Sequence, residues 1–273
     1  MDGSAVVGIV GGAGWLGSAI ATRGLSAGVL SSKSLLIISS RSPRGNRFAN
    51  WPEIVWTADN EELSRRADIV VLSVRPHQFR DISLNLEGRL VISVMAGISL
   101  ETLKRRLNAD RIVRAMPNAA AEIGRSYSPW VATGNVTASD RLFVSSLMAA
   151  CGEEDEVGME AHLDYLTGLS GSGPAFPALL ASSMLSHAET AGIPSHVAEK
   201  AVRGVVCGAS RLIDSDEFMP NSTVESFLNY RGTTAAALHE MIRAGFSDAV
   251  HAGLRAAALS VADMTASADK PAG

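Results

Sequence analysis

The sequence has 273 residues, of which 47% are hydrophobic and 19% charged, and its formal net charge is −4 at pH 7. This profile is typical of a globular protein whose core folds without a metal or disulfide. The small negative charge gives no electrostatic basis for binding nucleic acid or an anionic membrane. We expect Cys151 and Cys207 to be small buried hydrophobes in a reducing compartment. No apolar run reaches about 18 residues, so we expect a cytoplasmic protein without a membrane span.

The first half of the chain alternates short apolar runs with amphipathic stretches. Two of the amphipathic stretches, residues 15–28 and 61–66, have helical spacing. Continuous apolar strands separated by helices indicate a parallel sheet covered on both faces. We therefore predict an α/β Rossmann fold, that is, a doubly wound and mainly parallel sheet. The strands that we expect are residues 5–10, 35–39, 54–57, 68–74, 90–94 and 111–115.

The pattern changes near residue 160, and no convincing strand follows. Residues 174–191, 194–214 and 233–264 have the spacing of helices. Several of these segments are apolar on more than one face, and such a helix must be buried, here against a second subunit. We predict a Rossmann domain over residues 1–159, an all-α dimerisation domain over residues 160–273, and a homodimer or a multiple of dimers.

A glycine-rich turn follows the first expected strand. Gly12, Gly14 and Gly17 satisfy G-x-G-x-x-G, and the turn opens a helix inside a βαβ unit, as a dinucleotide site requires. The glycines permit a tight turn, close approach of a pyrophosphate and close packing of helix on strand. The phosphates would then meet free N–H groups at the helix N-terminus.

The end of the second expected strand discriminates between cofactors. An NAD site places an acidic residue about 20 residues after the glycines, but this chain has no acid between Asp2 and Glu53. Ser40 and Arg41 stand there instead, with Arg44 close behind. Hydroxyls and guanidinium groups suit a 2′-phosphate, so the sequence favours NADP; the alternative is an exposed basic loop.

Four further segments resemble the pyrroline-5-carboxylate reductase family, in order and over nearly the whole chain. They are residues 73–78 (SVRPHQ), 114–118 (RAMPN), 168–176 (GLSGSGPAF) and 231–234 (RGTT). The resemblance implies reduction of a small cyclic imine, 1-pyrroline-5-carboxylate, to L-proline with a nicotinamide cofactor. It also implies helices that interleave in a dimer, and a loop of the helical domain that binds the substrate carboxylate through backbone amides.

The dinucleotide motif and the resemblance, carried over position by position, together give a set of expected site residues. Thr234 is the expected catalytic residue, because the family's second threonine faces the imine nitrogen. The expected substrate-binding residues are Ser172, Asn229, Gly232, Thr233 and Thr234. The expected cofactor-binding residues are Gly12, Gly14, Trp15, Leu16, Gly17, Ser40, Arg41, Asn60, Val74, Arg75, Pro76, Met116, Pro117 and Asn118.

Other interpretations stay open at this point. Thr234 could be the N-cap of the following helix, and Ser172 could belong only to a tight turn. Tyr230-Arg231 replaces the family's usual Pro-Gly, which allows a different imine or a keto acid as substrate, or a cofactor-binding protein without catalysis. The histidines and cysteines show no metal-binding spacing, so we expect no metal.

Overall fold

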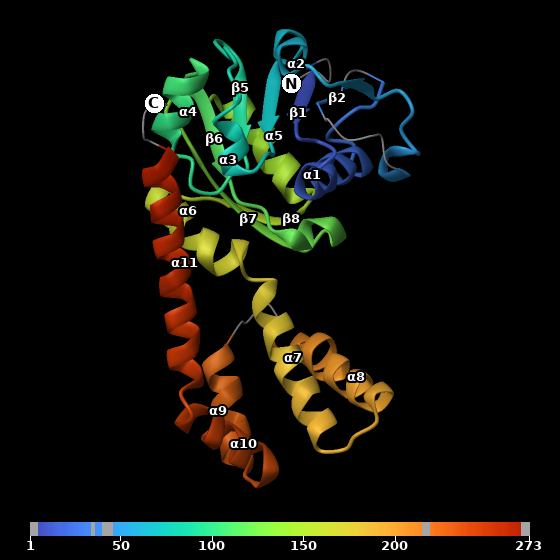
Figure 1. Cartoon of the computed structure of the whole chain (residues 1–273), viewed down its shortest axis with the longest axis vertical. Helices are drawn as coiled ribbons and strands as arrows, with labels where there is room; N and C mark the ends of the chain where they lie inside the picture. Colours follow the sequence, from blue (N-terminus) through green and yellow to red (C-terminus); the bar gives the residue numbers. More distant parts are fainter. Residues whose placement is uncertain (1–4, 34–35, 40–45, 215–218, 269–273) are drawn as a thin grey trace. The chain divides into compact units, whose positions relative to one another are not determined.

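The computed structural model describes residues 5–33, 36–39, 46–214 and 219–268. Within these residues one eight-stranded sheet has the order β3-β2-β1-β4-β5-β6-β7-β8 (Figure 1). Neighbouring strands are parallel except for β6 and β7, which are antiparallel. The predicted Rossmann fold is confirmed, and each of the six expected strands is present. The strands are β1 (Val7–Val10), β2 (Leu36–Ser39), β3 (Val55–Thr57), β4 (Ile69–Leu72), β5 (Leu90–Ser93), β6 (Arg111–Ala115), β7 (Ser126–Ala132) and β8 (Gly152–Glu156).

Two of these strands, β7 and β8, were not expected from the sequence. β7 contains Pro129, a residue that strand patterns usually exclude, yet its carbonyl still accepts a hydrogen bond from the Met116 amide at 2.9 Å. β8 reads GEEDE and lies at the edge of the sheet, where charged side chains face solvent. Neither strand therefore has the apolar run that marks the buried strands.

Helices cover both faces of the sheet because successive strand residues point to opposite faces. In β4, Ile69 and Val71 join the apolar cluster that includes α1 (Trp15–Ser26) and α5 (Ala138–Ala149). Val70 and Leu72 join the cluster on the other face. That cluster includes residues of α2 (Asn60–Arg66), α3 (Pro76–Phe79) and α4 (Leu100–Leu107).

The chain forms two compact units. The first comprises residues up to Ser172 together with the end of the last helix from Ala257, and the second is Gly173–Ala256. The expected domain border between residues 159 and 160 stays a prediction. The remaining elements are α6 (Glu160–Leu166), α7 (Ala175–Thr190), α8 (Ser195–Arg203), α9 (Pro220–Tyr230), α10 (Gly232–Arg243), α11 (Phe246–Ala268) and the short turns η1 (Asn46–Phe48), η2 (Ala119–Ile123), η3 (Thr167–Gly171), η4 (Gly204–Gly208) and η5 (Ala209–Ile213).

The described part of the second unit contains helices and turns but no strand. Its helices differ in detail from the expected ones. The expected helix over residues 233–264 is interrupted after α10, where Gly245 has a φ of +88° and lets the chain turn before α11. α8 ends at Arg203 and continues as short turns, and α9 had no expected counterpart.

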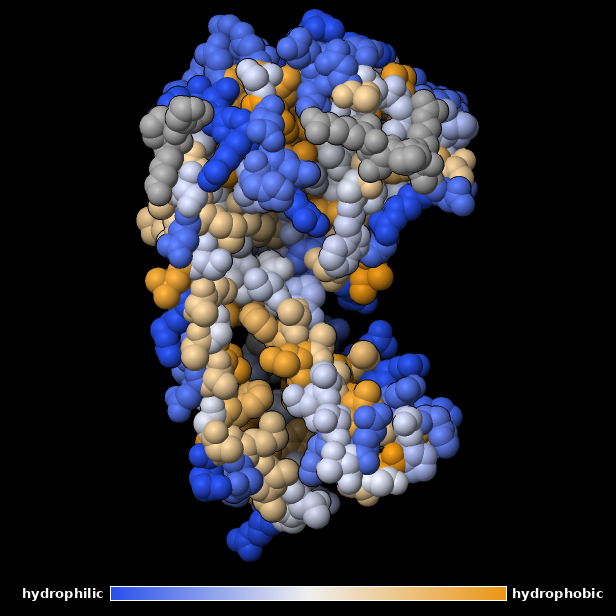
Figure 2. All heavy atoms as spheres, in the orientation of Figure 1, coloured by the Kyte–Doolittle hydropathy of each residue, from blue (hydrophilic) through white to orange (hydrophobic). Residues whose placement is uncertain are grey.

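Large apolar side chains are exposed on the second unit. None of the 16 residues of α7, all of them described, is buried. Figure 2 shows hydrophobic residues interspersed with hydrophilic ones on the visible surface of this unit. The large apolar side chains that are exposed on it include those of Leu179, Leu212 and Phe227. Among the described helices, none is both long and apolar enough to cross a membrane.

The two cysteines have different environments. Cys151 lies in the core of the first unit, and burial raises the pKa of its thiol to about 11. Cys207 is exposed on the single chain, so the expectation of a buried side chain is wrong for Cys207. Its segment, η4, belongs to the helical unit whose apolar faces are uncovered.

Candidate active site

The order of the strands reverses at β1, which pairs with β2 on one side and with β4 on the other. Ligands of doubly wound sheets bind outside the carboxyl ends of the strands at such a point. Gly11, the residue after β1, has a φ of +80°, and its amide donates to the Ser39 carbonyl at 3.1 Å. A Cβ at Gly11 would lie 2.4 Å from the Ser73 carbonyl oxygen. The left-handed residue of the turn is therefore Gly11, which precedes the expected motif, while Gly12 is needed for close packing because a Cβ there would lie 2.4 Å from Ile38 Cγ2.

The first turn of α1 presents free donors at the same edge. Gly14 is the N-cap and offers no side chain to the amides of Trp15, Leu16 and Gly17, which have no intrahelical carbonyl to bond. No acidic residue stands in this first turn. A Cβ at Gly17 would lie 2.6 Å from the Gly11 carbonyl oxygen, so glycine permits the close approach of helix and turn. The combination of donors and helix dipole suits a pyrophosphate.

The end of β2 is only partly described. Ser40 and Arg41, the residues expected to contact a 2′-phosphate, lie outside the described residues, as does Arg44. Ser39 precedes them, and its hydroxyl donates to Asn60 Oδ1 at 2.5 Å. Asn60 is the first residue of α2, so this expected cofactor residue stands at the carboxyl end of β2, as the hypothesis requires.

Arg47 joins this region to η2 by an ion pair and to α1 by a hydrogen bond, and the sequence indicated neither contact. Arg47 Nη2 lies 2.8 Å from Glu122 Oε1, and Arg47 Nη1 donates to the Ser18 hydroxyl at 3.0 Å. The other oxygen of Glu122 accepts from the Trp15 indole at 2.9 Å. Glu122 lies four residues after the M-P-N triplet, in a run of alanines, and no spacing rule connects it to Trp15 or Arg47.

Residues after β4 border the turn after β1. Val74 is partly buried, and its Cγ1 would lie 3.0 Å from a Cβ at Gly11. Arg75 has an extended backbone, and its amide donates to Gln78 Oε1 at 3.1 Å. Pro76 then starts α3, where its missing N–H costs nothing. These three expected cofactor residues therefore lie at the edge where β1 and β4 end.

The M-P-N triplet after β6 meets the glycine-rich segment near residue 170. The Asn118 side chain donates to the Ser170 carbonyl at 2.9 Å and accepts from the Ala120 amide at 2.9 Å. Met116 is buried, and a Cβ at Gly171 would lie 3.3 Å from Met116 Cγ. The structure thus brings together two of the segments that carry the family resemblance, although Asn118 and Ser170 are 52 positions apart in the sequence.

Ser172 closes the π-helical turn η3. Its amide donates to the Thr167 carbonyl at 3.0 Å, and its hydroxyl lies 3.4 Å from the same oxygen. This bonding favours the interpretation of Ser172 as part of a turn. Its substrate-binding role stays a prediction. Such π-helical turns occur frequently at functional sites.

The expected substrate loop lies in the second unit, between α9 and α10. Asn229 belongs to the last turn of α9, so it is helical rather than part of a loop. Arg231 has φ 64° and ψ −168°, and Gly232 has a φ of +78°. Arg231 is the N-cap of α10, which places Thr233 and Thr234 in its first turn. The alternative of Thr234 as the N-cap is therefore wrong. The first-turn amides of Gly232, Thr233 and Thr234 lack intrahelical partners.

Over the described part of the chain, no three His, Cys, Asp or Glu side chains gather as metal ligands would. The polar groups at the carboxyl edge of the sheet are backbone amides, hydroxyls and amide side chains, together with Arg75 and the Arg47–Glu122 ion pair. Backbone amides at a helix N-terminus suit phosphates.

Comparisons with known proteins agree with this geometry. Residues 160–264 match the family described as "Pyrroline-5-carboxylate reductase dimerisation", and residues 6–97 match "NADP oxidoreductase coenzyme F420-dependent". The chain is 30% identical to a pyrroline-5-carboxylate reductase of Pisum sativum over 86% of this chain and 87% of that protein. It is 30% identical to the pyrroline-5-carboxylate reductase of Methanosarcina acetivorans over 88% and 92% of the two chains.

Solved structures show the same fold. A pyrroline carboxylate reductase of Plasmodium falciparum with NADP bound has a TM-score of 0.84 at 23% identity, over 96% of this chain and 99% of that chain. The 1-pyrroline-5-carboxylate reductase of Streptococcus pyogenes has a TM-score of 0.82 at 26% identity, over 95% and 98%. With similarity of this extent in both sequence and fold, the chain belongs to the pyrroline-5-carboxylate reductase family.

Proposed function

We propose that this chain reduces 1-pyrroline-5-carboxylate to L-proline with NADPH. The observation that carries the proposal is the 30% identity to pyrroline-5-carboxylate reductases over most of the chain. Two features of the structure support it. The turn after β1 and the first turn of α1 present amides to a pyrophosphate, and Met116–Asn118 is held against Ser170 at the same edge of the sheet.

The chemistry requires little from the protein beyond placement. NADPH, when bound, supplies a hydride to the carbon of the protonated cyclic imine. Holding two reactants in the right geometry contributes roughly 7 to 11 kcal/mol in favourable cases. In this proposal the first-turn amides of α10 bind the substrate carboxylate, and the Thr234 hydroxyl hydrogen-bonds the imine nitrogen. Neither role requires a strong general base.

The direct test is a panel of cyclic imines and keto acids, each incubated with NADPH and followed by the loss of NADPH absorbance. We expect 1-pyrroline-5-carboxylate to be the best substrate. A faster reaction with another imine or keto acid would contradict this substrate, and no reaction with any compound would indicate a cofactor-binding protein without catalysis.

Thr234→Ala tests the contact with the reacting group. The substitution removes a hydrogen bond worth about 0.5 to 1.5 kcal/mol, or more when it meets charge. We expect turnover of 1-pyrroline-5-carboxylate to fall about tenfold or more, with the affinity for NADPH nearly unchanged. The matched control is Thr233→Ala, which keeps the backbone amide and should lower turnover less. Full activity in Thr234→Ala, with helix content intact by circular dichroism, would show that the hydroxyl has no role.

A second candidate function rests on the backbone of Arg231. Its φ and ψ lie in a region that is essentially restricted to glycine, and a residue held there costs about 1 to 3 kcal/mol. Pyrroline-5-carboxylate reductases usually have Pro-Gly where this chain has Tyr230-Arg231. An arginine kept in this conformation favours a substrate with an additional anionic group, which a guanidinium would bind.

The double substitution Tyr230→Pro, Arg231→Gly separates the two candidates. If the native loop serves a different imine, the double variant should turn over 1-pyrroline-5-carboxylate faster than the native protein does. If the native loop already serves this substrate, turnover should fall or stay level. The kinetics of both proteins on the same imine panel give the result.

The preference for NADPH over NADH rests on Ser40, Arg41 and Arg44, which stand where NAD sites have an acid. Arg41→Asp should shift the preference toward NADH, because it removes a donor for the 2′-phosphate and adds an acid for the ribose hydroxyls. The ratio of kcat/KM for the two cofactors measures the shift. A native protein that uses NADH equally well at low concentration would contradict the assignment.

We also propose a homodimer or a multiple of dimers. The apolar faces of α7 and its neighbours are exposed on the single chain, and the matching family is a dimerisation family. We expect sedimentation equilibrium at micromolar concentration to give twice the chain mass or a multiple of it. A single-chain mass under those conditions would exclude this assembly.

A further inference from the structure

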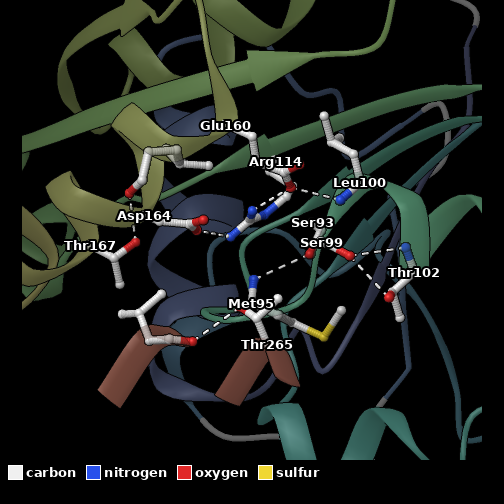
Figure 3. Close-up of polar contacts among 12 residues, drawn as sticks. Ser93, Met95, Ser99, Leu100, Thr102, Arg114, Glu160, Asp164, Thr167 and Thr265 are labelled. Carbon is white, nitrogen blue, oxygen red and sulfur yellow. Dashed lines mark hydrogen bonds and ion pairs between the residues drawn. The ribbon is translucent and has the colours of Figure 1, made fainter. Parts of the chain in front are cut away.

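A buried arginine in the first unit has no part in the function proposed above. Arg114 lies in β6, and only 1% of its side chain is exposed. Its two terminal nitrogens bind different carboxylates, Glu160 at 2.5 Å and Asp164 at 2.9 Å. Both acids lie on α6, four residues apart and therefore on the same face of the helix (Figure 3).

The cluster includes a third element. The Glu160 oxygen that binds Arg114 also accepts the backbone N–H of Leu100 at 2.7 Å. Leu100 is the first residue of α4, so Glu160 occupies one of the free donors at the start of that helix. One buried guanidinium thus joins β6 to α6, and through Glu160 to α4, as the dashed lines in Figure 3 show.

Stability alone does not explain this arrangement. Buried ion pairs are often no more stabilising than apolar side chains of similar volume, because desolvation offsets the attraction. Arg114 Nε is moreover buried without a hydrogen-bond partner among the described residues. What an ion cluster provides, and an apolar contact does not, is direction, since forked N–H donors bind carboxylates in a defined geometry.

β6 and α6, which Arg114 joins, lead directly to Met116–Asn118 and to η3, the two segments that meet at the candidate site. Arg114 stands two residues before Met116, while α6 runs directly into η3, which contains Ser170. Farther along, Asn118 donates to the Ser170 carbonyl, and Met116 lies against Gly171. The ion cluster and the Asn118 bond therefore fix the same pair of segments at two separate points.

We propose that Arg114, Glu160 and Asp164 form a positioning cluster that holds Met116–Asn118 against η3 in the geometry needed for hydride transfer. The three side chains act through Met116–Asn118 and η3 and touch neither substrate nor cofactor. The inference rests on the proposed function for its kinetic consequence, but its structural consequence is measured without any substrate.

The test is the neutral triple variant Arg114→Met, Glu160→Gln, Asp164→Asn. It removes all three charges together, so that no buried charge is left unpaired, and the Glu160→Gln change keeps a side-chain oxygen for the Leu100 amide. We expect a melting temperature close to that of the native protein and a kcat lower by about tenfold or more, because small misplacements of reacting groups are costly. The phosphate-binding turn after β1 is untouched, so any rise in the KM for NADPH should be smaller than the fall in kcat.

The matched control is Arg111→Met. Arg111 lies on the same strand and forms an ion pair with Asp140 at 3.0 Å, but it stands at the other end of β6 from Met116. This variant should lose stability and keep the native kcat. The single variant Arg114→Lys retains a charge but not the forked donors. Its kcat should therefore lie between that of the triple variant and that of the native protein.

Hydrogen exchange supplies a readout that does not depend on the substrate. In the triple variant, the amides of Ala115, Met116, Asn118 and residues 167–172 should exchange faster than in the native protein, while those of β1 and β4 stay protected. If the triple variant does not fold, Asp164→Asn, which leaves Arg114 paired with Glu160, is measured in the same way. Native kcat with native exchange, or an equal loss of kcat in Arg111→Met, overturns the proposal. If the native protein is inactive on 1-pyrroline-5-carboxylate, the proposed substrate is wrong. The hydrogen-exchange result then still tests whether Arg114, Glu160 and Asp164 hold Met116–Asn118 against η3.

Discussion

The close approach of the turn after β1 to the end of β4 is the constraint on which the first unit depends. Gly11 lies so near the Ser73 carbonyl that no side chain fits between them. β1 pairs with β2 on one side and with β4 on the other, so this contact lies at the point where the strand order reverses. The free amides of α1 and the segment from Val74 to Pro76 then face the same edge. A wider turn would separate these donors, and the pyrophosphate would lose the helix N-terminus that the fold provides for it.

The two units differ in how they bury apolar surface. The sheet of the first unit has a complete apolar cluster on each face, supplied by helices of the same chain. The helices of the second unit leave side chains such as Leu179 and Leu212 exposed. Helices that are apolar on several faces need further surface to cover them. The proposed substrate loop connects two of these helices, and the same region matches a dimerisation family, so the proposed assembly bears directly on the proposed activity.

Apolar periodicity predicted most of the fold, and its failures have physical causes. The six expected strands follow from their short apolar runs, but β8 is an acidic edge strand, and β7 contains Pro129. The break at Gly245 was missed because a single glycine in a helical pattern is usually tolerated.

The candidate site was predictable where it depends on local motifs, such as the glycine turn and the M-P-N triplet. The bonds of Glu122 to Trp15 and Arg47 span more than 70 residues, and only the folded chain brings these side chains together.

Tyr230-Arg231 departs from the Pro-Gly that the family usually has, and the free-energy cost of Arg231 in its observed conformation can be estimated. Holding an arginine in a glycine-type conformation costs about 1 to 3 kcal/mol, against a total stability of about 5 to 15 kcal/mol for a typical protein. The glycine that the family usually has at this position would remove that cost without disturbing Gly232 or the first turn of α10. The exposed guanidinium at the start of α10 adds a full positive charge to a helix end that already attracts anions. The loop between α9 and α10 therefore carries one more positive charge in this chain than a Pro-Gly loop would carry.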